Sequence, residues 1–164
     1  MIEAIVCDGR KGFFTAFKGF PIQMCQFHQT QIITRYLTRH PKTEAGKTLR
    51  SLALTLAKTD KESFSSWLSE WYDQYREFLG EFTVNPVTNR KQFSHKRLRS
   101  AYRSLVTNLP YLWTWYDYIG KVDIPNTTNC LDGTFSHVKH KANLHRGAKK
   151  EKRLKILSSL LSGR

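Results

Sequence analysis

The chain has 164 residues, of which 40% are hydrophobic, and it contains four tryptophans. This composition excludes a disordered tail and suits one domain with a core, or a core that carries an inserted subdomain. The formal net charge is +14, with 27 Lys and Arg against 13 Asp and Glu. So positive a field attracts polyanions, most commonly nucleic acid, although ribosomal and membrane-surface proteins are also basic.

The cysteines and the apolar runs indicate the compartment. There are three cysteines, Cys7, Cys25 and Cys130, and an odd, sparse set predicts a reducing compartment without a disulfide framework. The sequence shows no N-terminal secretion signal and no apolar run of membrane-spanning length. We therefore expect a cytoplasmic protein with no membrane partner.

The first thirty residues predict a strand, a short helix and a second strand. Residues 2–7 form an apolar run that stops at Asp8-Gly9, and Phe13, Phe14 and Phe17 then recur at helical spacing. Residues 21–27 are typical of a second strand. A strand, helix and strand in so short a segment favour a parallel pair.

The rest of the chain is predicted to be helical. Apolar stripes mark helices over 32–37, 49–56, 62–82 and 98–105, and 109–118 is rich in aromatic residues without a clear form. Thr59 with Glu62 fits a capping box for the helix over 62–82, whose aromatic face we interpret as core rather than as a base-stacking platform. Loops are expected at Asn85-Pro86 and at 125–129.

Two helices are predicted near the C-terminus. Asn129 can cap the first, which carries Leu131, Phe135 and Val138. The second follows Gly147 and should turn four leucines inward: Leu154, Leu157, Leu160 and Leu161.

Basic residues gather in two segments. Residues 90–103 hold six cations and no acid, and residues 139–155 hold eight cations and one acid. Clusters of one sign are suited to contacts with backbone phosphates, and the alternative is two solvated helix faces. In the second segment the candidate DNA-binding residues are Lys139, Lys141, Arg146, Lys149, Lys150 and Arg153.

Asp8 and Asp132 are the candidate metal ligands. Asp8 lies at the carboxyl end of the first predicted strand, where α/β sheets place functional groups, and it could equally be a turn or capping residue. Asp132 follows Asn129 by three positions, which also fits a residue that stabilises a helix start. As a pair, two carboxylates could hold the Mg²⁺ or Mn²⁺ ions that activate and stabilise oxygens in phosphodiester chemistry.

Cys25 and His28 form a Cys-x-x-His pair at the end of the second predicted strand. As a zinc half-site it is incomplete, since a closed site takes four ligands, and His137 and His140 on a helix would splay apart. We therefore expect a structural role, or one beside an active site, rather than zinc binding.

Three segments together carry a resemblance to a known family. Val6-Cys7-Asp8-Gly9, Cys25-Gln26-Phe27-His28 and Thr127-Thr128-Asn129-Cys130-Leu131-Asp132-Gly133 occur in an order and spacing that resemble transposases of bacterial insertion sequences related to the Mutator-like elements. That family has a ribonuclease H-like catalytic domain with three acids and a helical insertion between the second and the third. The resemblance covers nearly the whole chain.

The resemblance implies an α/β, helix-dominated fold. Residues 1–40 and 125–164 would form a partial ribonuclease H-like core, and residues 41–124 the helical insertion. Asp8 would be the second catalytic acid and Asp132 the third, where the family more often has Glu, with Cys25 and His28 as the paired motif. The family's first acid lies on an earlier strand, which implies that upstream strands are absent here and that this chain alone does not cut or join DNA.

The expected activity is DNA transposition. With Mg²⁺ or Mn²⁺, the intact enzyme would cleave and join phosphodiesters at transposon ends, as a homo-oligomer associated with the nucleoid. The alternatives are a non-catalytic nucleic-acid-binding protein, in which both aspartates are caps, and an interaction protein that uses the aromatic helix as its partner surface.

Overall fold

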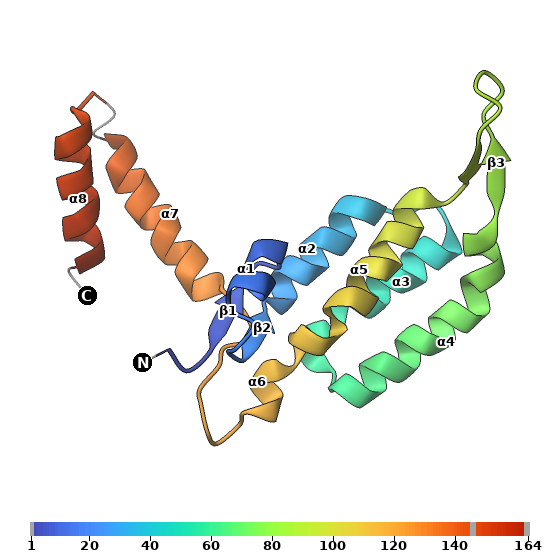
Figure 1. Cartoon of the computed structure of the whole chain (residues 1–164), viewed down its shortest axis with the longest axis horizontal. Coiled ribbons are helices and arrows are strands. Elements are labelled where there is room, and N and C mark those ends of the chain that lie inside the picture. The colour runs from blue at the N-terminus through green and yellow to red at the C-terminus, as the bar shows by residue number, and fades with distance from the viewer. Residues whose placement is uncertain (1, 145–146, 163–164) are drawn as a thin grey trace. The chain divides into compact units, whose positions relative to one another are not determined.

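The computed structural model describes residues 2–144 and 147–162, without the side chains at positions 130–132, 134, 135, 137, 142, 153, 161 and 162. The chain divides into two compact units, Met1–Thr127 and Thr128–Arg164. Helices dominate both units, and the strands are short (Figure 1). The expected mixture of helix and a little sheet is therefore confirmed at this coarse level.

The first unit begins with the predicted parallel pair. Strand β1 (Ile5–Cys7) and strand β2 (Ile22–Met24) flank helix α1 (Lys11–Ala16). The strands pair in parallel, with partners Ile5↔Ile22, Val6↔Gln23 and Cys7↔Met24. The strand–helix–strand prediction is confirmed, although both strands are shorter than their apolar runs.

The second strand ends earlier than predicted, because helix α2 (Gln26–Leu37) begins directly after Cys25. Phe27 and His28 therefore belong to the first turn of a helix, and the prediction that the Cys-x-x-His pair ends a strand is wrong. A short apolar run cannot by itself separate the end of a buried strand from the start of a buried helix. The backbone N–H of Gln26, which lacks a partner within the helix, donates to the carbonyl of Asn126 at 3.0 Å.

The helices that follow were largely predicted. They are α3 (Glu44–Leu54), the 3₁₀ turn η1 (Leu56–Lys58), α4 (Lys61–Gly80), α5 (Lys96–Leu112) and α6 (Thr114–Asp117). Helix α2 packs against α3 and α5, and α4 packs against α3 and α5. Their shared core includes Ile33, Leu49, Phe64, Leu105, Leu112 and Trp113, all buried.

The aromatic stripe of α4 is only partly core. Phe64 and Trp71 are buried, whereas Trp67 and Tyr72 are 44% and 40% exposed, and Phe82 lies beyond the helix in a strand. The stripe is wider than the face that the neighbouring helices cover. The core interpretation therefore holds for its centre and not for its edges.

Helix α4 is capped by Asp60, and not by the predicted Thr59 and Glu62. Asp60 Oδ1 accepts from the backbone N–H of Ser63 at 2.8 Å, and Oδ2 accepts from the Ser63 hydroxyl at 2.9 Å. These two bonds hold the pKa of the Asp60 carboxyl below its ordinary value of 3.8.

Removing this cap gives a pH-dependent loss of stability. We expect Asp60→Ala to lower the thermal unfolding midpoint by a few degrees at neutral pH, because an exposed N-cap is lost. Since the folded-state pKa is depressed, the wild-type advantage is present above the unfolded pKa and disappears as pH falls through the folded pKa. Thermal melts of both proteins between pH 3 and pH 7 check this, and a gap that stays constant over that range would contradict the mechanism.

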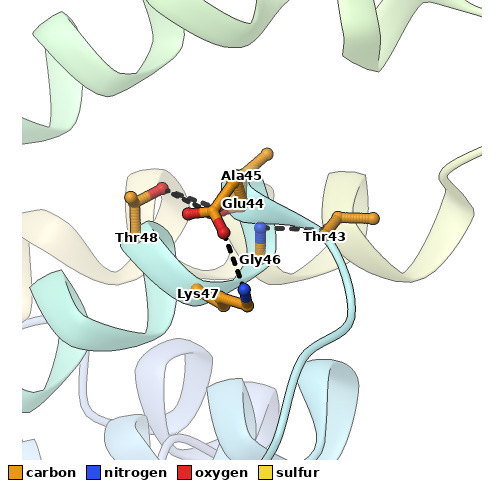
Figure 2. A network of polar contacts seen from close by, with 6 residues as sticks. All are labelled: Thr43, Glu44, Ala45, Gly46, Lys47 and Thr48. Atoms are coloured by element: carbon orange, nitrogen blue, oxygen red, sulfur yellow. Dashed lines mark hydrogen bonds and ion pairs between the residues drawn. The ribbon is translucent and has the colours of Figure 1, made fainter.

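The start of α3 is fixed by a local polar network (Figure 2). Thr43 Oγ1 accepts from the backbone N–H of Gly46 at 3.1 Å, and Lys47 pairs with Glu44 at 2.6 Å. The buried Trp71 of α4 donates its indole N–H to the carbonyl of Ala45 at 3.1 Å. The network therefore also fixes how α4 packs on α3.

A β-hairpin lies where only a loop was predicted, between α4 and α5. Strands β3 (Phe82–Val84) and β4 (Lys91–Phe93) pair antiparallel, with the rings of Phe82 and Phe93 stacked at 4.3 Å. Asn85 makes the turn, accepting from two backbone N–H groups, those of Val87 and Thr88. Three-residue strands are too short to show a period of two, so the sequence pattern could not reveal them.

The second unit consists of helices α7 (Asn129–Leu144) and α8 (Lys150–Ser162), which contact each other. Both were predicted, as was the loop before Asn129. Leu154, however, is 56% exposed, so the prediction that it turns inward is wrong. Leu157 and Leu160 are half-buried, and the side chain of Leu161 lies outside the described residues. Among the helices of the described ranges, none is long and apolar enough to cross a membrane.

Candidate functional site

Asp8 is the first residue beyond the carboxyl end of β1. Its carboxylate is 38% exposed, Oδ2 lies 3.2 Å from Nε of Arg10, and Oδ1 accepts from the backbone N–H of Arg10 at 3.3 Å. An exposed carboxylate at a strand end can bind a hard divalent cation. Because Arg10 is 80% exposed, it can move aside without leaving a buried charge.

Gly9 is required by the backbone that places Asp8. Its φ is +88°, in the region that side chains disfavour, and a Cβ there would lie 2.4 Å from Cε of the buried Met24. Met24 is the last residue of β2, so the turn after β1 closes directly on the neighbouring strand. A glycine at this position lets Asp8 project at the strand end while the chain passes over Met24.

Cys25 lies at the same end of the parallel pair as Asp8. Cys7 and Met24 are register partners, so Asp8 and Cys25 are the next residues of the two strands, and the Cys25 N–H donates to the Cys7 carbonyl at 2.8 Å. Cys25 is fully buried at the start of α2, and His28 is half-buried one turn further on. The predicted pair therefore stands at the strand ends, with Cys25 packed inside and His28 partly accessible.

Cys7 belongs to the core rather than to the chemistry of the site. Its side chain is 4% exposed, and burial raises the pKa of its thiol above the ordinary value. A thiol that stays protonated is a poor nucleophile and a poor metal ligand.

Two buried glutamines fix the end of β2, and neither is among the residues predicted for the site. Gln23 Nε2 and Gln26 Nε2 both donate to the carbonyl of Leu112, at 3.0 and 2.9 Å, and Gln23 Oε1 accepts from the backbone N–H of Trp115 at 3.0 Å. The carbonyl of Leu112, at the last turn of α5, has no partner within the helix. The sequence does carry a signal for these contacts, because Gln23 and Gln26 interrupt the apolar run over 21–27. Buried polar groups need hydrogen-bond partners, so such amides indicate a polar contact inside the core.

Asn126 returns the chain to the strand ends after the long helical segment. Its carbonyl accepts from Gln26 N–H at 3.0 Å, and its side-chain amide donates to Gln26 Oε1 at 3.4 Å. Gln26 directly follows Cys25, so the loop before α7 is attached beside the start of α2. No sequence signal linked these residues, which are 100 positions apart.

The second predicted acid is only partly described. Asp132 belongs to the first turns of α7, and its side chain lies outside the described residues. Within the described part of the chain, no three His, Cys, Asp or Glu side chains gather in a way that could hold a metal ion. The meeting of Asp8 and Asp132 at one cation stays a prediction.

The C-terminal basic residues are exposed wherever their side chains are described. Lys139 and Lys141 lie on α7, Lys149 precedes α8, and Lys150 begins it. Arg146 and the side chain of Arg153 lie outside the described residues. Exposed lysines suit phosphate contacts and solvated helix faces equally, so the DNA-binding role of this segment also stays a prediction.

Comparison of the chain with protein-family models, with curated proteins and with solved structures gives no match. The likeness to Mutator-related transposases therefore stays a resemblance carried by three short segments. The geometry at the strand ends and the distribution of charge are what bear on function.

Proposed function

We propose that the chain is part of a DNA transposase with a ribonuclease H-like catalytic core, cytoplasmic and associated with the nucleoid. Asp8 and Asp132 would hold Mg²⁺ or Mn²⁺ at the carboxyl end of the parallel strands. The observation that carries the proposal is the clustering of Asp8, Cys25 and the returning Asn126 at that one edge. In open α/β sheets, ligands bind outside the carboxyl ends of the strands.

The chain returns to this edge shortly before the second acid in the sequence. Asn126 is bonded to Gln26 at the start of α2, and Asp132 follows Asn126 by six positions. The chain thus leaves the strand ends at Gln26, in the first turn of α2, and returns to them at Asn126.

The chemistry follows from the residue types. Divalent ions bound by the two carboxylates would activate a water or a 3′-hydroxyl and stabilise the leaving oxygen of a phosphodiester. His28 would orient a strand or a nearby phosphate, and the exposed lysines of α7 and α8 would contact backbone phosphates. The intact enzyme would act as a homo-oligomer on transposon ends and target DNA.

One observation favours a second candidate, a non-catalytic nucleic-acid-binding protein. Both carboxylate oxygens of Asp8 are engaged by Arg10, through its backbone N–H and its guanidinium, as in a purely structural turn. In that case the net charge of +14 is the functional feature, and DNA affinity would not depend on Asp8.

A strand-transfer assay separates the two. The resemblance places the first acid on an upstream strand, so the assay uses the chain extended by upstream sequence that supplies it, with labelled transposon-end duplexes. We expect joined products with Mg²⁺ or Mn²⁺ and none with EDTA. DNA binding without any metal-dependent product would favour the second candidate, and products from the unextended chain would contradict the assignment of Asp8 as the second acid.

A further inference from the structure

Three arginines converge on a small surface pocket between α4 and α5. Arg76 comes from α4, and Arg99 and Arg103 lie one turn apart on α5. The pocket measures about 160 Å³, and its other lining residues are Tyr72, Leu79 and Tyr102. No acid lines it, so its charged groups are all of one sign.

The convergence is unfavourable unless an anion is present. Arg99 and Arg103 are an i, i+4 pair of like charges on one helix, which destabilises the helix, and Arg76 adds a third charge of the same sign. Within the described residues, no ion pair or hydrogen bond engages the guanidinium of Arg76 or of Arg103. Two guanidinium groups that border the same small volume are therefore not paired with an acid, although Asp73 is close enough to act electrostatically on Tyr102.

The side chain of Arg99 is fixed by two contacts with neighbouring elements. Its Nη1 donates to the carbonyl of Leu79 at 2.7 Å, and its guanidinium lies 3.6 Å from the ring centroid of Phe93 on the hairpin. A side chain fixed in this way loses little entropy when it binds a ligand. Arg99 still has further N–H donors for an anion, because a guanidinium carries five.

The two tyrosines form one wall of the pocket and can add donors. The rings of Tyr72 and Tyr102 stack at 4.9 Å with 14° between their planes. Burial, with smaller contributions from Tyr72 and Asp73, raises the pKa of Tyr102, so its hydroxyl remains a donor at neutral pH. Donors of both kinds therefore border the same volume.

We propose that Arg76, Arg99 and Arg103, with Tyr72 and Tyr102, form a binding site for one phosphate group, and that a backbone phosphate of DNA fills it. A volume of about 160 Å³ is well below the roughly 300–1,000 Å³ of sites for whole small molecules. Planar guanidinium groups bind phosphate oxygens in pairs. The choice of DNA rests on the proposed function, whereas the anion site does not.

The first test uses inorganic phosphate and the full chain. Thermal unfolding is followed in phosphate and in chloride at equal ionic strength, for wild type, Arg76→Ala/Arg103→Ala and the charge-matched Arg35→Ala/Arg39→Ala. We expect wild type and the control to gain on the order of 3 °C when phosphate is at ten times its dissociation constant. The pocket variant should gain nothing. An equal gain in all three proteins would indicate general salt stabilisation and overturn the site.

The second test identifies the source of the phosphate. Anisotropy of a labelled 20-base-pair duplex, without divalent metal, is measured between 50 and 200 mM salt. The pocket variant should bind on the order of tenfold more weakly, with a salt slope smaller by about one, and the control should stay within about twofold of wild type. Equal losses in both double variants would overturn the site as a specific DNA contact, and a phosphate response without any DNA effect would overturn DNA as its source.

A conservative variant guards against a folding artefact. Arg76→Lys/Arg103→Lys keeps both charges but loses the paired guanidinium geometry, so it should recover most of the salt slope and only part of the affinity. Full recovery of affinity would contradict a seated phosphate and indicate diffuse attraction alone. Neither binding test involves metal or strand transfer, so a failure here is distinguishable from a failure of the proposed function.

Discussion

Asp8→Asn in the upstream-extended protein should lower metal-dependent strand transfer on the order of a thousandfold. The change removes one negative charge from a ligand of the proposed cations and leaves the shape of the side chain almost unchanged. Folding should be preserved, because the Asn carbonyl oxygen can still accept from the Arg10 N–H that Asp8 Oδ1 engages. Strand transfer and far-ultraviolet circular dichroism on the same samples measure the two effects.

The control for this experiment is Asp117→Asn. Asp117 is an exposed residue of α6, and its carboxylate takes part in no hydrogen bond or ion pair within the described residues. Asp117→Asn should leave strand transfer within about twofold of wild type, since it makes the same charge change as Asp8→Asn at a carboxylate that holds no proposed cation. Equal losses in both variants would point to net charge rather than to a metal ligand.

Asp132→Asn should match Asp8→Asn, and Asp132→Glu should retain part of the activity. Glutamate is the residue that the family resemblance places at this position, and its extra methylene moves the carboxylate outward without removing its charge. The affinity for duplex DNA without metal should be the same as that of wild type in Asp8→Asn, Asp132→Asn and Asp132→Glu. Full activity of Asp132→Asn would remove Asp132 from the metal site and return it to the role of a helix-capping acid.

The sequence predicted most of the first unit because its elements bury regular faces. The apolar runs around Val6 and Ile22 and the stripes of α2 to α5 each present a period that matches strand or helix. A buried Ile33 or Leu105 needs only to be apolar at the right spacing, so local pattern was sufficient for these elements.

The spacing of apolar residues could not predict the long-range polar contacts. The double acceptance by Leu112 from Gln23 and Gln26, and the bonds between Gln26 and Asn126, join residues that are 86 to 100 positions apart. They depend on which carbonyls the helix ends leave exposed, and this is set by tertiary packing. The sequence predicted which residues belong to the candidate site but not how they come together. These contacts bring the loop at Asn126 to the carboxyl end of the parallel strands, where Asp8 and Cys25 lie.

Two further differences between prediction and structure concern the cap of α4 and the hairpin that follows this helix. Thr59 and Asp60 are both good caps, and the structure selects Asp60 because its carboxylate reaches both the N–H and the hydroxyl of Ser63. The hairpin depends on the Asn85 turn and on Phe82 stacking against Phe93, a contact across eleven residues that no short window contains. The first of these differences moves a helix cap by one residue, and the second adds a short hairpin between two helices that were both predicted.

Trp113→Ala should destabilise the first unit by roughly 3–5 kcal/mol. Trp113 lies in the aromatic stretch over 109–118, whose form the sequence pattern does not predict, yet it is 2% exposed at the junction of α5 and α6. Its ring packs against Phe64 at 5.2 Å, and its indole N–H donates to the carbonyl of Thr59 at 3.0 Å. Truncation therefore leaves a cavity and an unpaired carbonyl together, a large loss against a typical stability of about 5–15 kcal/mol.

Two further tryptophan variants divide this effect into its parts. Trp113→Phe keeps most of the ring and loses the bond to Thr59, so it should cost about 1–3 kcal/mol. Trp67→Ala removes the same side chain at a position that is 44% exposed, so it should cost roughly 1 kcal/mol or less. Urea unfolding followed by circular dichroism measures all three. Equal losses for Trp67→Ala and Trp113→Ala would contradict a core closed around Trp113. They would also contradict the packing of α6, from which the Trp115 N–H donates to Gln23 of β2.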